Sequence, residues 1–533
     1  MKTNILTKYS LSLLAAIVLM TGCTKDFTDI NTNPIAYGPK SFDPNYTLTS
    51  AQLNYTGSID FAFDTWRGNL IYASTMMQGF STVVSYWAGD KYALNTDYTG
   101  AYWGSTSTTG AYIEQVRFIS DVVEYSKSDP KFNNVHQIGR IWKALVFARI
   151  TDLYGDCPYS EAGLSYYNGI LTPKYDRQQA IYADLLKEVD EATNALVVGG
   201  DAVRGDLIYG GNIDKWKRFG NSLLLRLAMR LTKIDENTAK TYAQKVVGKT
   251  MLDNSDNAFI KHDLSGARVT QNRNSQVLNG DGGQEHYYVK WSKTFIDRLK
   301  NANDPRLGKV AVTNLFPVLT SKDQNPNFNA TPAVQKGMPN GKDLLGVPAT
   351  NVTQDPSYTT FGDYSSPNPA MIKKDGIAFI LTYSETEFLL AEAAQRWGIG
   401  GSAADHYREG LAKSITCLVQ YDPSLEVTDA VANAYANANP YNAANGLEMI
   451  NTQYWLHTCT TLDFYETWCN WRRSGFPVLT PVNHRNGVTS GVIPRRFPYP
   501  LAEAASNETN YRAASAAVPG GDNLTGRVWW DKP

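Results

Sequence analysis

The sequence predicts a mainly α-helical protein, in which tetratricopeptide-like helix pairs form one compact unit decorated by long loops. Two observations lead to this fold class. Apolar residues recur at helical spacing over several segments in the middle of the chain. The segments between the expected helices are polar, long, and rich in Tyr, Trp, Gly, Asn and Pro.

Three consecutive segments each carry one apolar stripe of helical period, which predicts three amphipathic helices. Asp176 and Gln179 have the spacing of a capping box at the start of the second helix. The stripes are Ile138, Trp142, Leu145 and Ala148 in 135–152; Ile181, Leu185, Val189, Ala192 and Leu196 in 177–197; and Trp216, Phe219, Leu223, Leu224, Leu227 and Leu231 in 213–231.

A helix pair is expected further along the chain. Ser384 and Glu387 have capping-box spacing, and an apolar face follows until Gly398 ends the helix. A second helix is expected from about Ala403 to Leu418. Helix, short glycine turn, helix is the unit of a tetratricopeptide-type repeat, although no clean repeat of about 34 residues is present. Any repeats are therefore degenerate.

The start of the chain predicts export and lipidation. Two lysines precede a short apolar run, which is too short to span a bilayer and fits a signal peptide over residues 1–22. Cys23 follows Gly22 and resembles the cysteine of a bacterial lipobox. Residues 23–45 are expected to form a lipid-anchored tether, and 46–533 a ligand-binding domain.

Composition and motifs argue against several functions. A net charge of −1 gives no electrostatic basis for binding nucleic acid. The six histidines and five cysteines show neither HExxH nor CxxC spacing, no GxSxG elbow occurs, and no metal or cofactor is expected. The glycine-rich loop 279–285 has oxygen ligands for calcium but lacks the EF-hand order. Cys459 and Cys469 are the nearest cysteine pair, either as a disulfide or as buried thiols.

Several segments resemble the SusD/RagB family of outer-membrane nutrient-binding lipoproteins. They follow the family's order along the chain and are jointly specific, although Cys157 stands where the family usually has Val or Ile. The segments are Cys23–Phe27, Ile30–Pro34, Asp152–Ala162, Asn303–Arg306, Tyr383–Ala393, Trp471–Pro477, Ile493–Pro500 and Trp529–Asp531.

This resemblance implies a single helical unit, lipid-anchored in the outer membrane and facing the cell exterior. It also implies a SusC-like TonB-dependent transporter as partner, to which the protein would deliver a glycan or, as in some members, a peptide. The family motifs are expected to be structural, with Arg472, Arg473, Arg495 and Arg496 binding helix ends and carboxylates. An adhesin or scaffold and, least favoured, a surface glycosidase remain open.

The ligand residues are expected in the aromatic loops, since Tyr and Trp combine a flat apolar face with a polar group. The chain holds 32 Tyr and 12 Trp against 19 Phe, so Tyr and Trp predominate. Asp90, Asn95 and Asp97 could bind sugar hydroxyls, and Trp87→Ala is expected to weaken glycan binding without unfolding the protein. The candidate platforms are Tyr86, Trp87, Tyr92, Tyr98, Tyr102 and Trp103 in 84–110, with Tyr358 and Tyr364 in 314–376. Some of them could instead belong to the core.

Overall fold

The computed structural model describes residues 42–57, 64–104 and 109–533. The predicted signal peptide, Cys23 and nearly all of the predicted tether lie outside these residues. The chain divides into residues 1–44 and a unit of residues 45–533, which holds its own extensive core. None of the helices in the described ranges has the length and apolar character needed to cross a membrane.

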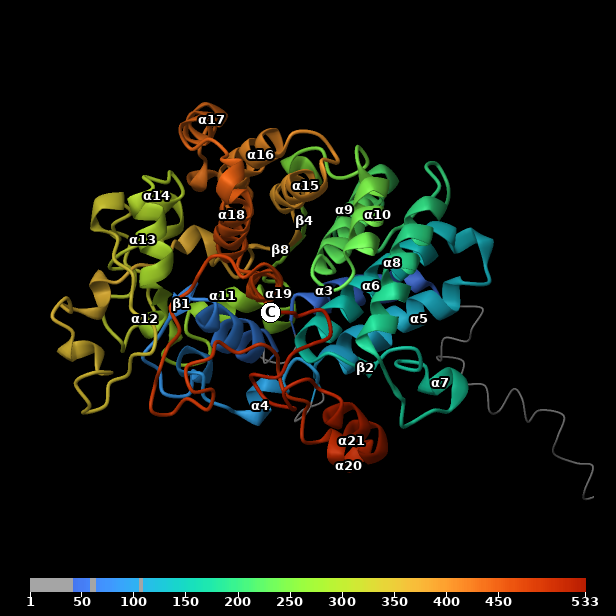
Figure 1. Ribbon diagram of the computed structural model, residues 1–533, viewed down its shortest axis with the longest axis horizontal. Helices are drawn as coiled ribbons and strands as arrows, with labels where there is room; N and C mark the ends of the chain where they lie inside the picture. The colour runs from blue at the N-terminus through green and yellow to red at the C-terminus, as the bar shows by residue number, and fades with distance from the viewer. Residues whose placement is uncertain (1–41, 58–63, 105–108) are drawn as a thin grey trace, which may run out of the picture. The chain divides into compact units, whose positions relative to one another are not determined.

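The predicted fold class is confirmed: helices dominate, and consecutive helices pack against one another along the chain. In Figure 1, α5, α6, α8, α9 and α10 follow one another on one side of the compact unit, and α15, α16 and α18 lie next to them. The helices of this layer are α5 (Arg117–Ser126), α6 (Asn133–Tyr154), α8 (Gln178–Ala195), α9 (Ile213–Arg230), α10 (Glu236–Val246), α15 (Tyr383–Trp397), α16 (Ala403–Thr416), α17 (Asp429–Ala438), α18 (Gly446–Thr460) and α19 (Phe464–Ser474).

The remaining α-helices are short or lie in the decorating segments, as Figure 1 shows for α12 to α14 and for α20 and α21. They are α3 (Pro44–Tyr55), α4 (Thr96–Thr99), α7 (Ser165–Asn168), α11 (Arg273–Leu278), α12 (Glu285–Tyr288), α13 (Lys293–Asn301), α14 (Leu307–Val310), α20 (Glu503–Ser506) and α21 (Glu508–Ala516). Two π-helices, η1 (Thr65–Ser74) and η3 (Ala111–Val116), occur in the first third of the chain.

The three apolar stripes form the buried faces of α6, α8 and α9, as their spacing predicts. Every stripe residue of α8 and α9 is buried, and so are those of α6. Trp142 of α6 meets Trp216 and Phe219 of α9 through ring contacts with centroids 6.3 and 6.5 Å apart. Large aromatic side chains thus fill the space between these two helices. Their packing removes much apolar surface from water.

Both predicted capping boxes are wrong in position. The first residue of α15 is preceded by Thr382, which forms the capping box with Glu385. Ser384 instead donates to the Gly410 carbonyl of α16, 2.7 Å away, and Glu387 binds His406 of α16. The pair Ser384 and Glu387 therefore joins two helices instead of capping one. The predicted stop is confirmed, because Gly398 adopts the left-handed conformation with φ +67°.

The second box fails because its carboxylate is used elsewhere. Asp176 accepts hydrogen bonds from the backbone N–H and hydroxyl of Ser160. The N–H of Gln178, the first residue of α8, donates to Asp156 Oδ1 at 2.8 Å. The cap of α8 thus comes from a residue 22 positions away in the chain, which local spacing cannot reveal.

Within the described residues, short strands pair into four antiparallel two-stranded ladders, which connect loops that are distant in sequence. The first ladder aligns Phe80 with Trp291, and the Trp291 N–H then donates to the Ser365 carbonyl at 2.8 Å. Three long segments thereby meet at one place. The ladders are β1 (Phe80–Ser81) with β5 (Lys290–Trp291), β2 (Cys157–Pro158) with β3 (Tyr175–Asp176), β4 (Ala258–Lys261) with β8 (Ile377–Leu381), and β6 (Ala311–Val312) with β7 (Ser366–Pro367).

The arginines of the motifs near the C-terminus make structural contacts, as expected. Arg495 pairs with Asp531, and Arg496 pairs with Asp522. Arg472 donates to the backbone carbonyls of Asp152 and Arg495 at 2.7 and 2.8 Å. These contacts connect α19 to the end of α6 and to the C-terminal segment.

Candidate functional site

A buried carboxylate on α12 organises the first group of aromatic side chains. Glu285 Oε1 accepts hydrogen bonds from Trp66 Nε1 at 3.2 Å, from Trp87 Nε1 at 3.3 Å, and from the Tyr86 hydroxyl. Burial and this carboxylate raise the pKa of Tyr86 above its usual value, so the phenol stays protonated and keeps donating. One carboxylate thus fixes three rings that come from two different stretches of chain.

The glycine-rich loop before α12 packs directly against these rings. A Cβ on Gly282 would lie 2.9 Å from Cζ2 of Trp66, which is closer than carbon atoms approach. Only glycine lets the backbone come this near the indole without moving it. Trp66 and Tyr86 remain half-buried and meet edge to face, with centroids 6.2 Å apart.

A second aromatic group surrounds Phe361, at the other end of α12. Tyr287, Tyr288 and Tyr358 place their ring centroids 5.6, 4.8 and 5.4 Å from that of Phe361. Phe361 is buried, whereas the three tyrosines are half-buried. The tyrosines therefore stand on a fixed apolar base and keep part of each ring in contact with solvent.

The two groups are connected by α12, which is a single helical turn. Its first residue binds Trp66 and Tyr86, and its last residue contacts Phe361, about 5 Å further along the helix axis. Val83, next to the first loop, also belongs to the apolar cluster of Phe361. We call Trp66, Tyr86, Tyr287, Tyr288 and Tyr358 the α12 aromatic surface.

Four of the predicted platforms are core residues, which corrects the sequence-based expectation. Trp87, Tyr92, Tyr102 and Tyr364 are almost completely buried and have no face open to a ligand. The Tyr92 hydroxyl accepts from the Val482 N–H at 3.2 Å, and that of Tyr102 donates to Gln115 at 3.1 Å. Long-range partners hold these rings inside, although their local sequence is polar.

Two of the three polar residues predicted to assist them, Asp90 and Asn95, have structural roles as well. Asp90 is buried and accepts from Asn340 Nδ2 and from the Gly341 N–H, and burial raises its pKa to about 6. Asn95 caps α4 by accepting from the N–H groups of Asp97 and Tyr98. Asp97 is exposed.

The other predicted platforms are divided between different places. Tyr86 and Tyr358 belong to the α12 aromatic surface. Tyr98 is half-buried beneath the guanidinium of Arg67, whose carbon lies 4.9 Å from the ring centroid. Trp103 is also buried in the core, with 4% of its surface exposed, and it contributes to the wall of a separate large cavity that is described below.

Sequence reasoning missed four residues of this site: Trp66, Glu285, Tyr287 and Tyr288. A signal was present, since Tyr287 and Tyr288 lie one residue beyond the glycine-rich loop 279–285 in a long polar segment. Trp66 is the second residue of the π-helix η1, whose other residues are mostly buried, and it lies outside the long polar segments.

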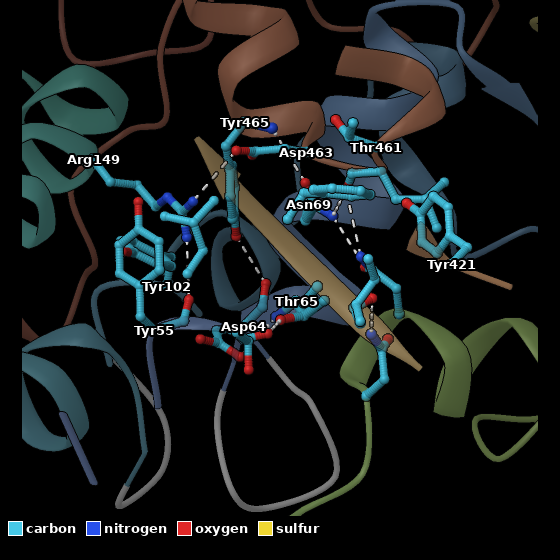
Figure 2. A pocket seen from close by; sticks show the side chains of 18 residues that line it. Tyr55, Asp64, Thr65, Asn69, Tyr102, Arg149, Tyr421, Thr461, Asp463 and Tyr465 are labelled. Carbon is cyan, nitrogen blue, oxygen red and sulfur yellow. Dashed lines mark hydrogen bonds and ion pairs between the residues drawn. The ribbon is translucent and has the colours of Figure 1, made fainter. Parts of the chain in front are cut away.

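A polar cavity in the interior is too small to be the binding site. It has a volume of about 40 Å³, enough for a few water molecules, whereas ligand sites usually exceed about 300 Å³. Figure 2 shows Arg149 beside Tyr55 and Asp463, with its guanidinium carbon 3.9 Å from the Tyr55 ring centroid. The Tyr465 hydroxyl reaches the Asp64 carbonyl at 2.9 Å. We interpret this cavity as a hydrated part of the core.

The two carboxylates of the glycine-rich loop bind other side chains. Asp281 pairs with Lys374 at 2.8 Å, and Glu285 binds the aromatic donors. Among the described residues, no three His, Cys, Asp or Glu side chains gather in the manner of a metal site. Cys157, Cys417, Cys459 and Cys469 are buried free thiols, so Cys459 and Cys469 are not joined by a disulfide.

Comparisons with known proteins place these observations in context. A family model for starch-binding proteins that associate with the outer membrane, of SusD-like type, matches residues 42–500. A solved chitin-binding protein is 31% identical with a TM-score of 0.78, and the match covers 92% of this chain and all of that one. A SusD-like structure labelled Bacteroidetes AC2a is 26% identical with the same TM-score and coverage.

A chitin-binding SusD homologue from Flavobacterium johnsoniae is 22% identical, with a TM-score of 0.72 over 92% of this chain and 99% of that chain, which supports the fold alone. A search of curated proteins gives no match.

Proposed function

Because this chain belongs to the SusD-like family of starch-binding proteins that associate with the outer membrane, we propose that it captures a glycan on the α12 aromatic surface. The observation that carries this proposal is the set of half-buried rings held in place by Glu285 and Phe361. A sugar ring has a face of C–H bonds that packs on a flat aromatic ring, and pre-oriented rings lose little entropy on binding. We propose binding without turnover.

Chitin oligosaccharides are the first glycans to test. A protein 31% identical to this chain over nearly its whole length is described as chitin-binding, and the family description names starch. The N-acetyl methyl groups of chitin add apolar area that suits a tyrosine-rich surface. We therefore propose an N-acetylated glycan as ligand and use a starch oligosaccharide as the comparison.

We expect Tyr288→Ala and Tyr358→Ala each to weaken glycan binding by about tenfold, equivalent to about 1.4 kcal/mol, because each removes one platform. Calorimetry with N-acetylchitohexaose and with maltoheptaose measures this loss. Tyr288→Phe keeps the ring and should keep most of the affinity. Tyr46→Ala is the matched control, because this tyrosine is 77% exposed and lies in α3, away from the proposed surface.

Three results would count against this proposal. Full affinity in both alanine variants would remove the α12 aromatic surface from the binding site. Absence of binding to every glycan in a broad panel would remove the glycan function. Release of shorter sugars during incubation with the hexasaccharide would indicate an enzyme instead. A thermal melt of each variant identifies any loss of affinity that comes from unfolding.

We further propose that lipidated Cys23 anchors the protein to the outer membrane, beside a SusC-like transporter that receives the glycan. The lipobox-like sequence and the family's association with the outer membrane support this. A tether raises the effective concentration of the protein at its partner. We expect Cys23→Ala to shift the protein out of the membrane fraction. Affinity purification of the wild type from native membranes should recover a large TonB-dependent transporter.

The two readouts of this experiment are independent. A Cys23→Ala variant that still fractionates with outer membranes lacking the transporter would contradict the anchor. Repeated recovery of the wild-type protein alone would contradict the partnership and favour a scaffold.

A further inference from the structure

A large cavity lies between α5, the loop that carries α7, and α20, away from the α12 aromatic surface. Its volume is about 670 Å³, which falls in the range of ligand-binding sites. Figure 1 shows α7 and α20 well apart from α12 within the compact unit. No residue of the α12 aromatic surface lines this cavity.

The walls combine aromatic rings with carboxylates. Trp103 and Tyr112 pack together on one side, with ring centroids 4.8 Å apart. Tyr125 and Tyr166 also line the cavity, and Tyr167 connects them by edge-to-face contacts at 6.1 and 5.4 Å. Tyr166 is 83% exposed, so its ring stands at the wall with an open face.

Internal hydrogen bonds hold the two carboxylates in place. Glu503 accepts from Trp103 Nε1 at 3.2 Å and from the Tyr175 hydroxyl at 2.6 Å. Asp121 accepts from the Tyr167 hydroxyl at 2.8 Å. Each carboxylate oxygen can accept more than one hydrogen bond, so both groups retain the capacity to bind ligand hydroxyls.

Close contacts hold together the elements around the cavity, so the cavity is preformed. Gly163 has φ +73°, and a Cβ there would lie 2.5 Å from Ser120 Oγ of α5, so glycine allows the loop to approach the helix. Asn507 Nδ2 donates to the Pro173 carbonyl at 2.7 Å and connects the α20 segment to the same loop.

We propose that this cavity is a second saccharide-binding site, which holds another part of the same polymer that the α12 aromatic surface binds. Stacking rings beside fixed carboxylate acceptors are the groups that a hydroxylated ring with an apolar face requires. Two separated sites on one chain bind one polymer more tightly than either alone, because the second contact becomes intramolecular. This inference rests on the proposed glycan function.

The test compares Tyr166→Ala, alone and with Asp121→Asn, against Tyr288→Ala and the exposed control Tyr46→Ala. Retention on colloidal chitin and calorimetry with N-acetylchitohexaose are the two readouts. We expect the Tyr166→Ala and Asp121→Asn double variant to lose about tenfold in retention on the polymer. In the Tyr288→Ala background, the residual hexasaccharide binding should disappear when Tyr166→Ala is added.

The outcomes separate the two proposals. The second site would be overturned, and the first retained, by the following pair of results. The Tyr166→Ala and Asp121→Asn double variant keeps full polymer retention and hexasaccharide binding, whereas Tyr288→Ala binds weakly. Failure of the wild-type protein to bind any glycan would overturn both. Loss of transporter co-purification in the Tyr166→Ala variant with unchanged glycan binding would assign the cavity to a protein partner and overturn the saccharide assignment.

Discussion

Replacing Arg473 with methionine is expected to lower the free energy of unfolding by about 3–5 kcal/mol, because it leaves a buried carboxylate without its main partner. Arg473 is 1% exposed and holds both oxygens of Glu392, at 2.6 and 2.7 Å. It also donates to Asn451 and Asn470 at 3.0 Å. These contacts connect α19 with α15 and α18 in the interior.

The pH dependence of this effect has a defined sign. Burial alone would raise the pKa of Glu392, but Arg473 and Arg396 hold it at about 2. A carboxyl with a lowered pKa stabilises the folded protein at neutral pH, and this stabilisation is lost as the pH falls through the folded pKa. Without Arg473, the pKa of Glu392 rises and the side chain can take up a proton. The loss caused by Arg473→Met should therefore be smaller at pH 4.5 than at pH 7.

Urea unfolding at both pH values measures the effect, with Arg512→Met as the matched control. Arg512 pairs with Glu508 at 2.8 Å on α21, but their side chains are 70% and 58% exposed. Such pairs contribute about 1 kcal/mol or less. Equal losses in Arg473→Met and Arg512→Met would show that the buried pair is not a main contributor to stability.

Replacing Trp87 with alanine is also expected to cost about 3–5 kcal/mol, the usual range for deleting a large buried aromatic side chain. This reverses the expectation from the sequence that the variant keeps its thermal midpoint. Trp87 is 0% exposed, packs in the main core, and donates to Glu285 at 3.3 Å. Its removal leaves a cavity beneath the α12 aromatic surface.

Trp87→Phe is the informative control, because it keeps most of the volume and loses the indole N–H. It should cost clearly less than Trp87→Ala, and urea unfolding followed by tryptophan fluorescence compares the two. The opposite result would assign Trp87 to the ligand site: a Trp87→Ala protein that is as stable as the wild type but binds glycan weakly.

The helices could be predicted from the sequence because their signal is local. The stripe from Ile181 to Leu196 repeats at the helical period, and burying that stripe requires no knowledge of its partner. Gly398 ends α15 as predicted, since a left-handed residue at a helix end is a local requirement. The role of Arg473 and its neighbours in binding carboxylates was likewise apparent from the family resemblance.

The caps and the site required the tertiary structure. The residue that caps α8 and the carboxylate that orients Trp87 are 22 and 198 positions away from their partners. A polar, aromatic-rich loop has the same composition whether its rings face solvent or the core. Tyr86 and Tyr358 are half-buried, whereas Trp87 and Tyr364 are buried in the core. The difference arises because α12 and Phe361 pack against one side of each segment. Local sequence therefore determined the helices, and long-range packing decided which aromatic rings remain available to a ligand.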